Sequence, residues 1–178
     1  NLSQNLGKLV LTTNNLTTTV AEVRLYEADK VSSLVPRWSE SNKKADLMVI
    51  SAHEGDELLF FGGLIPTAVG EGKNVEAVFL SGSGRDRLEE SLEAMWTAGL
   101  TNAPVYLGFE EQNVRKYEDA VNAWDLETAV SALVERIRAT QPDVIVTHNV
   151  NGEDGDNQHT YTATLVRRAV LLAADPAS

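Results

Sequence analysis

An apolar segment, residues 46–52, runs directly into His53, and Asp56 follows three residues later. A short apolar run of this length is typical of a buried β-strand. In an open parallel sheet, ligands bind at the edge formed by the carboxyl ends of the strands. The sequence therefore predicts that an imidazole and a carboxylate, both metal-binding groups, lie together at a ligand-binding edge.

From residue 46 onward, short apolar strands alternate with helical segments, which predicts an α/β fold. The expected strands cover residues 46–52, 75–81, 105–107 and 143–147, and their Val, Ile and Leu content is typical of strands covered on both faces. The expected helices cover residues 57–70, 86–98, 126–139 and 160–174. This order predicts a Rossmann-like, mostly parallel sheet with helices on both faces.

Three local signals refine the expected helices. Pro66 is expected to kink or break the first helix, and Asp125 is expected to cap the third. In the helix over residues 86–98, the spacing places four side chains on one apolar face: Leu88, Leu92, Met95 and Trp96.

The first 35 residues are rich in β-forming residues and read as a separate N-terminal segment. Strands are expected over residues 8–13 and 18–26, with a turn between them. A segment of this length is too short to form its own core. It is therefore either a hairpin docked on the main domain or the remnant of a preceding domain. Residues 36–45 are polar and read as a linker, which leaves residues 46–178 for the α/β domain.

Composition narrows the classes of partner. The net charge of −11 argues against a nucleic-acid-binding surface, because phosphate neutralisation needs clustered Lys and Arg. The chain has no cysteine, so a transition metal would have to be held by His and carboxylate. No apolar run approaches the ~18 residues of a membrane span, and no signal peptide is visible. We therefore expect a soluble protein, either cytoplasmic or exported with its leader removed.

The three histidines of the chain, His53, His148 and His159, all lie near two expected strand ends. His53 and Asp56 could share a Zn²⁺ ion with a third ligand, either His159 or His148; two His and one carboxylate are typical of catalytic zinc. Acidic residues at a helix N-terminus are also stabilised by the helix dipole without any metal. Spacing alone leaves both interpretations open.

Longer segments extend this pattern into a family resemblance. Ser51-Ala-His53-Glu-Gly-Asp56-Glu57-Leu-Leu, with Gly62-Gly63 after it, resembles the Ala-His-Pro-Asp-Asp-Glu segment of the zinc-dependent N-acetylglucosaminyl de-N-acetylases, the PIG-L/LmbE-like family. Three further segments agree with the family in order: Val75 to Ser83, Arg87-x-x-Glu90, and Thr147-His148 followed by Gly152-Glu153 and His159. The resemblance covers about residues 45–175. Family domains usually continue with more sheet than this chain contains. A second interpretation is therefore that the α/β domain is truncated at its C-terminus, at Ser178.

The resemblance implies roles for individual residues. His53, Asp56 and His159 fall on the family's metal ligands, for Zn²⁺ or another divalent metal. Arg87 falls on a residue that anchors a substrate hydroxyl or phosphate; pairing with Glu90 on its own helix is the structural alternative. His148 is expected to bind substrate or to support a metal ligand through a hydrogen bond. The alternative is a histidine of the core whose ring hydrogen-bonds to the backbone.

Two positions depart from the family pattern. Gly55 stands where the family has its general-base aspartate, and glycine has no group that could take a proton. Asp156 stands where the family has a histidine that supports the tetrahedral intermediate, and a carboxylate repels a developing oxyanion. Loss of the proton-transfer group alone should cost roughly 10²–10⁴-fold in rate. Glu54 and Asp156 are the catalytic candidates that could replace the missing groups.

The sequence thus favours a metal-dependent hydrolase that removes an acetyl group from an N-acetylated amino sugar or its conjugate. The alternative is a catalytically impaired family member that binds carbohydrate or metal. A dinucleotide-binding protein is less well supported, because residues 81–84 lack the full Gly-x-Gly-x-x-Gly spacing. A structural carbohydrate-binding module is a further alternative. The loops over residues 110–123 and 148–158 are expected to decide the aglycone of the substrate.

Overall fold

The computed structural model describes residues 24–27, 29–33, 35–40, 44–82, 85–112 and 114–177. The chain divides into two compact units, residues 1–37 and 38–178. Every helix and strand within those described ranges lies in the second unit. In the same ranges, no helix combines the length and the apolar character that crossing a membrane requires.

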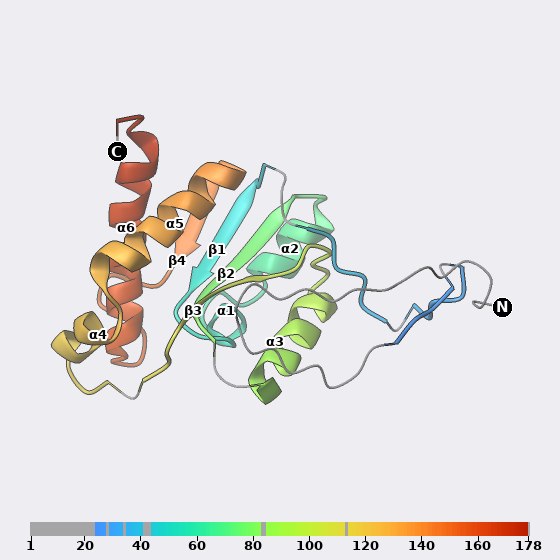
Figure 1. Cartoon of the computed structure of the whole chain (residues 1–178), viewed down its shortest axis with the longest axis horizontal. Coiled ribbons are helices and arrows are strands. Elements are labelled where there is room, and N and C mark those ends of the chain that lie inside the picture. The colour runs from blue at the N-terminus through green and yellow to red at the C-terminus, as the bar shows by residue number, and fades with distance from the viewer. Residues whose placement is uncertain are drawn as a thin grey trace. The chain divides into compact units, whose positions relative to one another are not determined.

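The second unit is built on a four-stranded parallel sheet (Figure 1). Its strands are β1 (Leu47–Ser51), β2 (Val75–Ser81), β3 (Val105–Phe109) and β4 (Val144–Thr147), in the spatial order β3-β2-β1-β4. The chain runs outward from β1 through β2 to β3 and then crosses back to place β4 on the other side of β1. The strand order therefore reverses between β1 and β4, and a reversal of this kind opens a crevice at the carboxyl ends of the two strands.

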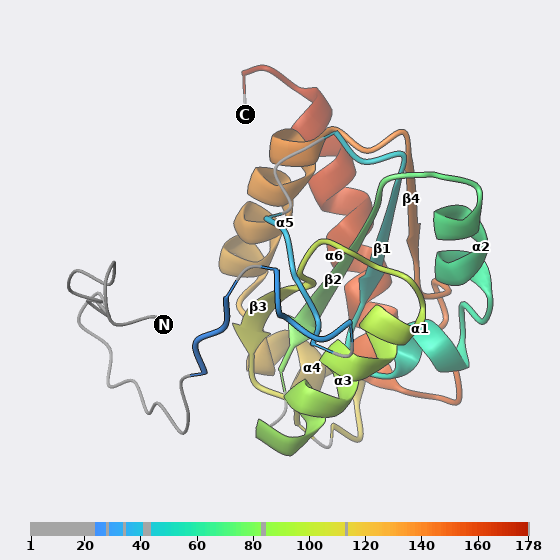
Figure 2. The same ribbon diagram turned by 90° about the vertical axis from the view of Figure 1, so that its right-hand side faces the viewer.

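Six helices complete the described fold, and they cover both faces of the sheet (Figure 2). They are α1 (Asp56–Leu59), α2 (Leu64–Gly70), α3 (Arg85–Thr97), α4 (Tyr117–Ala123), α5 (Leu126–Thr140) and α6 (Asn157–Ala174). Alternate residues of β1 enter two separate cores, as the two-residue period of a strand requires. Met48 and Ile50 pack with α5 and α6, whereas Leu47 and Val49 pack with α2 and α3.

The parallel α/β architecture is as predicted, and the expected strands agree with the observed ones to within two residues at each end. The central strands β1 and β2 are fully buried. The prediction that all four strands are covered on both faces is wrong for the edge strands, since Val144 in β4 is 53% exposed. An edge strand has a neighbour on one side only, so its side chains are less well covered.

Several helix predictions need correction. The expected helix over residues 57–70 is two helices, and the chain breaks at residues 60–63 rather than at Pro66. Pro66 is the third residue of α2, where the backbone N–H has no intrahelical acceptor and its loss is tolerated. Gly62 lies in the turn between α1 and α2 and has a φ of +52°, which favours glycine. Close packing is not the reason for this glycine, because a Cβ atom at this position would have no neighbour within 4 Å.

Two further differences concern α3 and α4. Met95 of α3 is fully buried as expected, but Leu88 is exposed. Helix α4 lies within the segment 110–123 that was expected to be a loop. The Asp125 cap of α5 is as predicted, since the side chain accepts a hydrogen bond from Thr128 N–H.

Part of the expected linker belongs to the α/β unit. Ser39 forms a parallel bridge with Asn102, and Trp38 packs edge-to-face on Trp96 with ring centroids 5.3 Å apart. The expected strand over residues 8–13 lies outside the described residues. Residues 24–26, the described end of the second expected strand, are not in a strand. Both interpretations of the N-terminal segment, a docked hairpin or the remnant of a preceding domain, stay predictions.

The core between the sheet and α5 generates a stability prediction. Leu133 is fully buried there, so Leu133→Ala should lower the free energy of unfolding by about 2–5 kcal/mol through lost burial and the cavity left behind. The matched control is Leu171→Ala on α6, where the side chain is 75% exposed and the cost should stay below about 0.5 kcal/mol. Urea denaturation followed by circular dichroism measures both, and equal effects would contradict the assigned core.

Candidate metal centre

The candidate site lies at the point where the strand order reverses. His53 follows β1 in a tight turn, and His148 directly follows β4. His159 lies in the first turn of α6. The turn after β1 depends on Gly55, whose φ of +100° is a conformation that other residues rarely adopt. This turn aims His53 and Asp56 into the same space.

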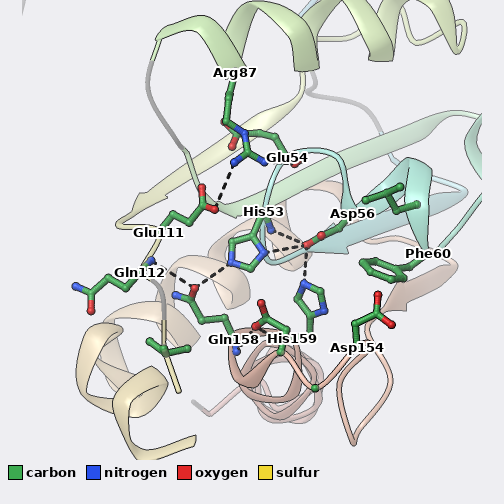
Figure 3. Close-up of a pocket in the computed structure, with 14 residues that line it drawn as sticks. His53, Glu54, Asp56, Phe60, Arg87, Glu111, Gln112, Asp154, Gln158 and His159 are labelled. Atoms are coloured by element: carbon green, nitrogen blue, oxygen red, sulfur yellow. Dashed lines mark hydrogen bonds and ion pairs between the residues drawn. The ribbon is translucent and has the colours of Figure 1, made fainter. Parts of the chain in front are cut away.

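One carboxylate oxygen, Asp56 Oδ2, is the centre of the cluster (Figure 3). It lies 3.3 Å from His53 Nδ1, 3.3 Å from His148 Nε2 and 3.2 Å from His159 Nε2. It also accepts a hydrogen bond of 2.9 Å from the backbone N–H of His53. Burial acts to raise the pKa of Asp56, but the surrounding imidazoles and the backbone N–H of His53 hold it well below its usual range. Asp56 is therefore a fixed anion.

A hydrogen-bond chain orients the imidazole of His53. Its Nε2 lies 3.0 Å from Gln158 Oε1, and that atom also lies 3.5 Å from the backbone N–H of Gln112. Because a backbone N–H can only donate, the Gln158 atom between them is the amide oxygen, so His53 Nε2 must donate to it. The other nitrogen, Nδ1, faces Asp56. Burial acts to lower the pKa of His53, but Asp56 and Gln158 raise it above the ordinary value.

His148 and His159 stack face to face, with ring centroids 4.0 Å apart and an interplanar angle of 7°. Glu153 Oε2 lies 2.7 Å from His148 Nδ1, and the backbone N–H of Ala52 donates to His148 Nε2 at 3.0 Å. Nε2 cannot accept this bond and also donate to Asp56. The backbone N–H is a fixed donor, so we assign Nε2 as an acceptor and Nδ1 as the protonated nitrogen. Both nitrogens of His148 are then engaged.

His159 differs from His148 in having an unused nitrogen. Its Nδ1 is buried and forms no hydrogen bond within the part of the chain that the structure describes. Glu153 Oε2 is 3.4 Å away but is not in hydrogen-bond geometry. Burial acts to lower the pKa of His159, whereas the contact with Asp56 raises it above the ordinary value. A buried polar atom without a partner is costly, and such atoms often mark a binding function.

These residues open onto a cavity of about 570 Å³. In Figure 3, His53, Asp56 and His159 lie close together, with Glu54 and Arg87 on one side and Phe60 and Asp154 on another. Arg87 lies 3.4 Å from Glu111 Oε1 and donates to the backbone oxygen of Glu54. The structure thus pairs Arg87 with Glu111 rather than with Glu90 of its own helix. The side chain of His148 is fully buried and does not line the cavity.

The two carboxylates expected to take part in catalysis have different surroundings. Glu54 lines the cavity and also a second, smaller cavity of about 230 Å³ that it shares with Glu57. Asp156 also lines the main cavity and caps α6, because its Oδ1 accepts hydrogen bonds from the N–H groups of Gln158 and His159 at 2.6 and 3.2 Å. The cap explains why a carboxylate is favourable at position 156.

Two overlapping groups of side chains could hold a metal ion among the described residues. In one, ligand atoms of His53, Asp156 and His159 all lie within 4.8 Å of one another; in the other, those of Asp56, His148 and His159 do. The triad expected from sequence, His53, Asp56 and His159, is not itself one of these groups. Its two imidazoles each approach Asp56 Oδ2, at 3.3 Å from His53 Nδ1 and 3.2 Å from His159 Nε2, and its role as a ligand set stays a prediction.

Sequence reasoning missed three polar supporting residues. Glu153 was noticed within a motif but was given no role, and Gln158, adjacent to His159, was not considered. Gln112 carries no sequence signal, because it reaches the site through its backbone N–H from the segment after β3. A donor or acceptor for each ligand imidazole is expected in metal sites, so the residues flanking His159 were the place to search.

This geometry defines a Rossmann-like α/β domain with a histidine–carboxylate cluster at its strand ends. Residues 48–170 match the model of the PIG-L family, described as GlcNAc-PI de-N-acetylase. This match covers well over half of the chain, so the chain belongs to the PIG-L family.

Individual relatives agree with this assignment. The chain is 28% identical over 164 residues to a 1D-myo-inositol 2-acetamido-2-deoxy-alpha-D-glucopyranoside deacetylase from Catenulispora acidiphila, an alignment that covers 74% of this chain and 50% of the relative. The fold is similar to that of the conserved protein TT1542 from Thermus thermophilus, with a TM-score of 0.60 and 26% identity over 72% of this chain and 56% of the other.

A more distant structure shares the fold alone. The N,N'-diacetylchitobiose deacetylase from Pyrococcus horikoshii aligns with a TM-score of 0.58 and 18% identity, covering 74% of this chain and 50% of that protein. The chain spans about half the length of the curated relatives it matches.

The environment of Glu57 generates a prediction about pH. Glu57 is 1% exposed and accepts a hydrogen bond from Gly55 N–H, and burial raises its pKa to about 7 from an ordinary value of 4.5. The folded protein therefore binds more protons than the unfolded chain between these values, so the contribution of Glu57 to stability is present below pH 4.5 and is lost as the pH rises through 7.

Glu57→Gln should remove this dependence, since an uncharged amide can still accept the Gly55 hydrogen bond. In a metal chelator at pH 8, the variant should be more stable than the parent by up to about 3 kcal/mol, and at pH 4 the two should be similar. Urea denaturation across this pH range measures the difference. A parallel pH profile for parent and variant would contradict the prediction.

Proposed function

We propose that this protein is a metal-dependent de-N-acetylase that acts on an N-acetylated amino sugar or its conjugate. The observation that carries the proposal is the convergence of His53, Asp56 and His159 at the wall of a cavity large enough for a sugar. Membership of a family whose relatives are deacetylases supplies the reaction type.

The residues at the site fit a divalent metal. His53 and His159 would supply nitrogen and Asp56 would supply oxygen, a donor set that suits Zn²⁺. Gln158 holds the far nitrogen of His53, which is the support a metal-bound imidazole usually has. The far nitrogen of His159, Nδ1, has no such hydrogen bond within the described residues, and Glu153 Oε2 is 3.4 Å from it. When bound, the ion would polarise the amide carbonyl and make a water molecule more acidic.

His148 fits a supporting role better than a direct one. Its side chain is shielded from the cavity, and both of its nitrogens are occupied, by Glu153 and by the backbone of Ala52. We therefore propose that His148 positions His159 through their stacked rings. Its expected role in binding substrate is less well supported.

Glu54 is our candidate for the proton transfers. Hydrolysis adds the elements of water across the amide bond: the oxygen joins the acetyl carbon, the C–N bond breaks, and the nitrogen leaves as an amine. Glu54 lines the cavity, so it could take the proton from the attacking water and return it to the departing nitrogen. Asp156 is a weaker candidate base, because its Oδ1 is already occupied by two N–H groups in its role as the cap of α6.

Arg87 is proposed to bind the substrate. It lines the cavity beside Glu111 and Gln112, so its guanidinium could donate hydrogen bonds to a sugar hydroxyl. The pair with Glu111 reduces its positive charge, which favours a hydroxyl over a phosphate as its partner.

A catalytically impaired binding protein is the second candidate, and the Gly55 turn favours it. Gly55 has no side chain where the family's general base is expected, and its positive φ disfavours a residue that has one. If Glu54 does not transfer protons, the cavity would bind an amino sugar without cleaving it. The two functions differ in turnover and not in metal content.

The metal assignment predicts the effect of removing one ligand. The parent protein should purify with or take up about one divalent ion per chain, and His159→Ala should lose it because two of three ligands cannot hold the ion tightly. Elemental analysis of both proteins after dialysis against zinc measures this. Retention of stoichiometric metal by His159→Ala would contradict the assignment. The control is Gln141→Ala. Gln141 lies in the turn between α5 and β4, at the amino ends of the strands, whereas the site lies at their carboxyl ends.

The catalytic assignment predicts a loss of turnover with metal retained. Release of acetate from N-acetylglucosamine conjugates should fall by roughly 10²–10⁴-fold in Glu54→Gln, because the amide cannot take the proton. Glu135→Gln, an exposed change on α5, is the matched control and should keep full activity. An acetate assay on zinc-loaded protein measures each rate. Loaded parent protein that binds the sugar and releases no acetate would instead establish the binding function.

A further inference from the structure

We infer that Asp156 is a fourth protein ligand of the metal, so that the site holds its ion with two imidazoles and two carboxylates. This inference rests on the metal-dependent function proposed above and adds a residue to it. At position 156 the resemblance to the family places a histidine that supports the reaction intermediate, so the assignment is a property of this chain rather than of the family pattern.

The first support is distance. A carboxylate oxygen of Asp156 and a ring nitrogen from each of His53 and His159 all lie within 4.8 Å of one another. Two donors that each bind a metal at about 2.0–2.2 Å are separated by no more than about 4.4 Å, so small side-chain movements suffice to bring these three atoms onto one ion. Asp56 Oδ2 already lies 3.3 and 3.2 Å from nitrogens of the same two imidazoles. Both carboxylates therefore lie close to the imidazoles of His53 and His159, although Asp56 and Asp156 belong to different groups.

The second support is the way in which Asp156 is held. As the cap of α6, its Oδ1 is fixed by two backbone N–H groups, one of which belongs to His159 itself. A carboxylate has about four lone-pair positions, so two hydrogen bonds leave capacity for a cation. The cap thus orients a ligand in the same way that Gln158 orients His53, and it ties the position of Asp156 to that of His159.

The third support is charge. Among the described residues, the walls of the cavity carry five carboxylates, one guanidinium and the imidazoles of His53 and His159. The acids are Glu54, Asp56, Glu111, Asp154 and Asp156; the guanidinium is that of Arg87. The negative charge of Asp156 acts on both His53 and His159. A divalent cation between these groups would neutralise two of the acids, which would add to the stabilisation that the cap of α6 already gives the carboxylate of Asp156.

A second carboxylate changes which metals the site prefers. Carboxylate oxygen suits Mn²⁺ and Mg²⁺, whereas imidazole suits Zn²⁺, Fe²⁺ and Ni²⁺. Two of each favour a divalent ion that accepts five or six donors over one restricted to four. The ion bound most effectively should therefore come from the first-row transition metals, and removal of Asp156 should shift the preference of the site towards Zn²⁺ over Mn²⁺.

The test compares two helix caps. Asn is as good a cap as Asp, so Asp156→Asn should keep α6 intact while removing the charged ligand. The matched control is Asp125→Asn, which makes the same change at the cap of α5. Competition against a chelator should show that Asp156→Asn weakens Mn²⁺ binding by more than about 100-fold, beyond the usual effect of a supporting residue, and that Asp125→Asn leaves it unchanged. Asp156→Ser, another good cap, repeats the test if the first variant fails to fold.

Crystals of the parent protein soaked in Mn²⁺ supply a direct measurement that does not depend on activity. Anomalous scattering should place the ion in coordination contact with Asp156 as well as with His53, Asp56 and His159. An ion held by those three residues with Asp156 beyond about 3 Å would overturn the inference and leave the proposed function intact. Failure of the parent protein to bind any divalent metal would overturn both.

Discussion

The buried carboxylate of Asp56 is the group on which the organisation of the site depends. A buried charge is costly unless it is paired and hydrogen-bonded. Asp56 meets this requirement with one backbone N–H and the imidazoles of His53 and His159, and His148 Nε2 lies 3.3 Å away; these groups come from the turn after β1, the start of α6 and the end of β4. One anion thus links three segments that are far apart in the sequence, and it does so at the point where the strand order reverses.

The conformation of Gly55 explains how the turn after β1 differs from the family pattern. Its φ of +100° lets the chain enter α1 while His53 and Asp56 face the same space. An aspartate at position 55 would be strained in this conformation, so the backbone and the loss of the usual base are linked. Glu54 and Glu57 lie on either side of this glycine and are both buried. The turn therefore remains rich in acid even though the expected general base is missing.

Sequence predicted the sheet well because the strands obey a local rule. Each is a short apolar run, and the central pair, β1 and β2, is buried on both faces. The break before α2 was placed wrongly because Pro66 was judged by its residue type and not by its position in the first turn. Helix α4 was missed because it has only seven residues and a single fully buried side chain, Ala120. A short helix of that kind depends on tertiary packing, which has no local signature.

The ligand candidates could be read from sequence, whereas the residues that orient them could not. His53, Asp56 and His159 were recognisable by residue type and by the ends of the strands they follow. The hydrogen bond from His53 to Gln158, and the enclosure of His148 between Glu153 and Ala52, depend on distances across the fold. These contacts decide which nitrogen faces the centre, and they therefore determine whether a histidine is a ligand or a support.

The same contacts imply that protons and metal ions compete for one site. Burial acts to lower the pKa values of His53 and His159, but Asp56 raises both above the ordinary value, so in the absence of a metal these rings bind protons more tightly than free imidazoles do. A divalent cation would bring equivalent charge, and it would have to displace those protons to reach the nitrogens. The negative surroundings of the cluster, which would exclude an anionic ligand, are what make it a strong site for a cation.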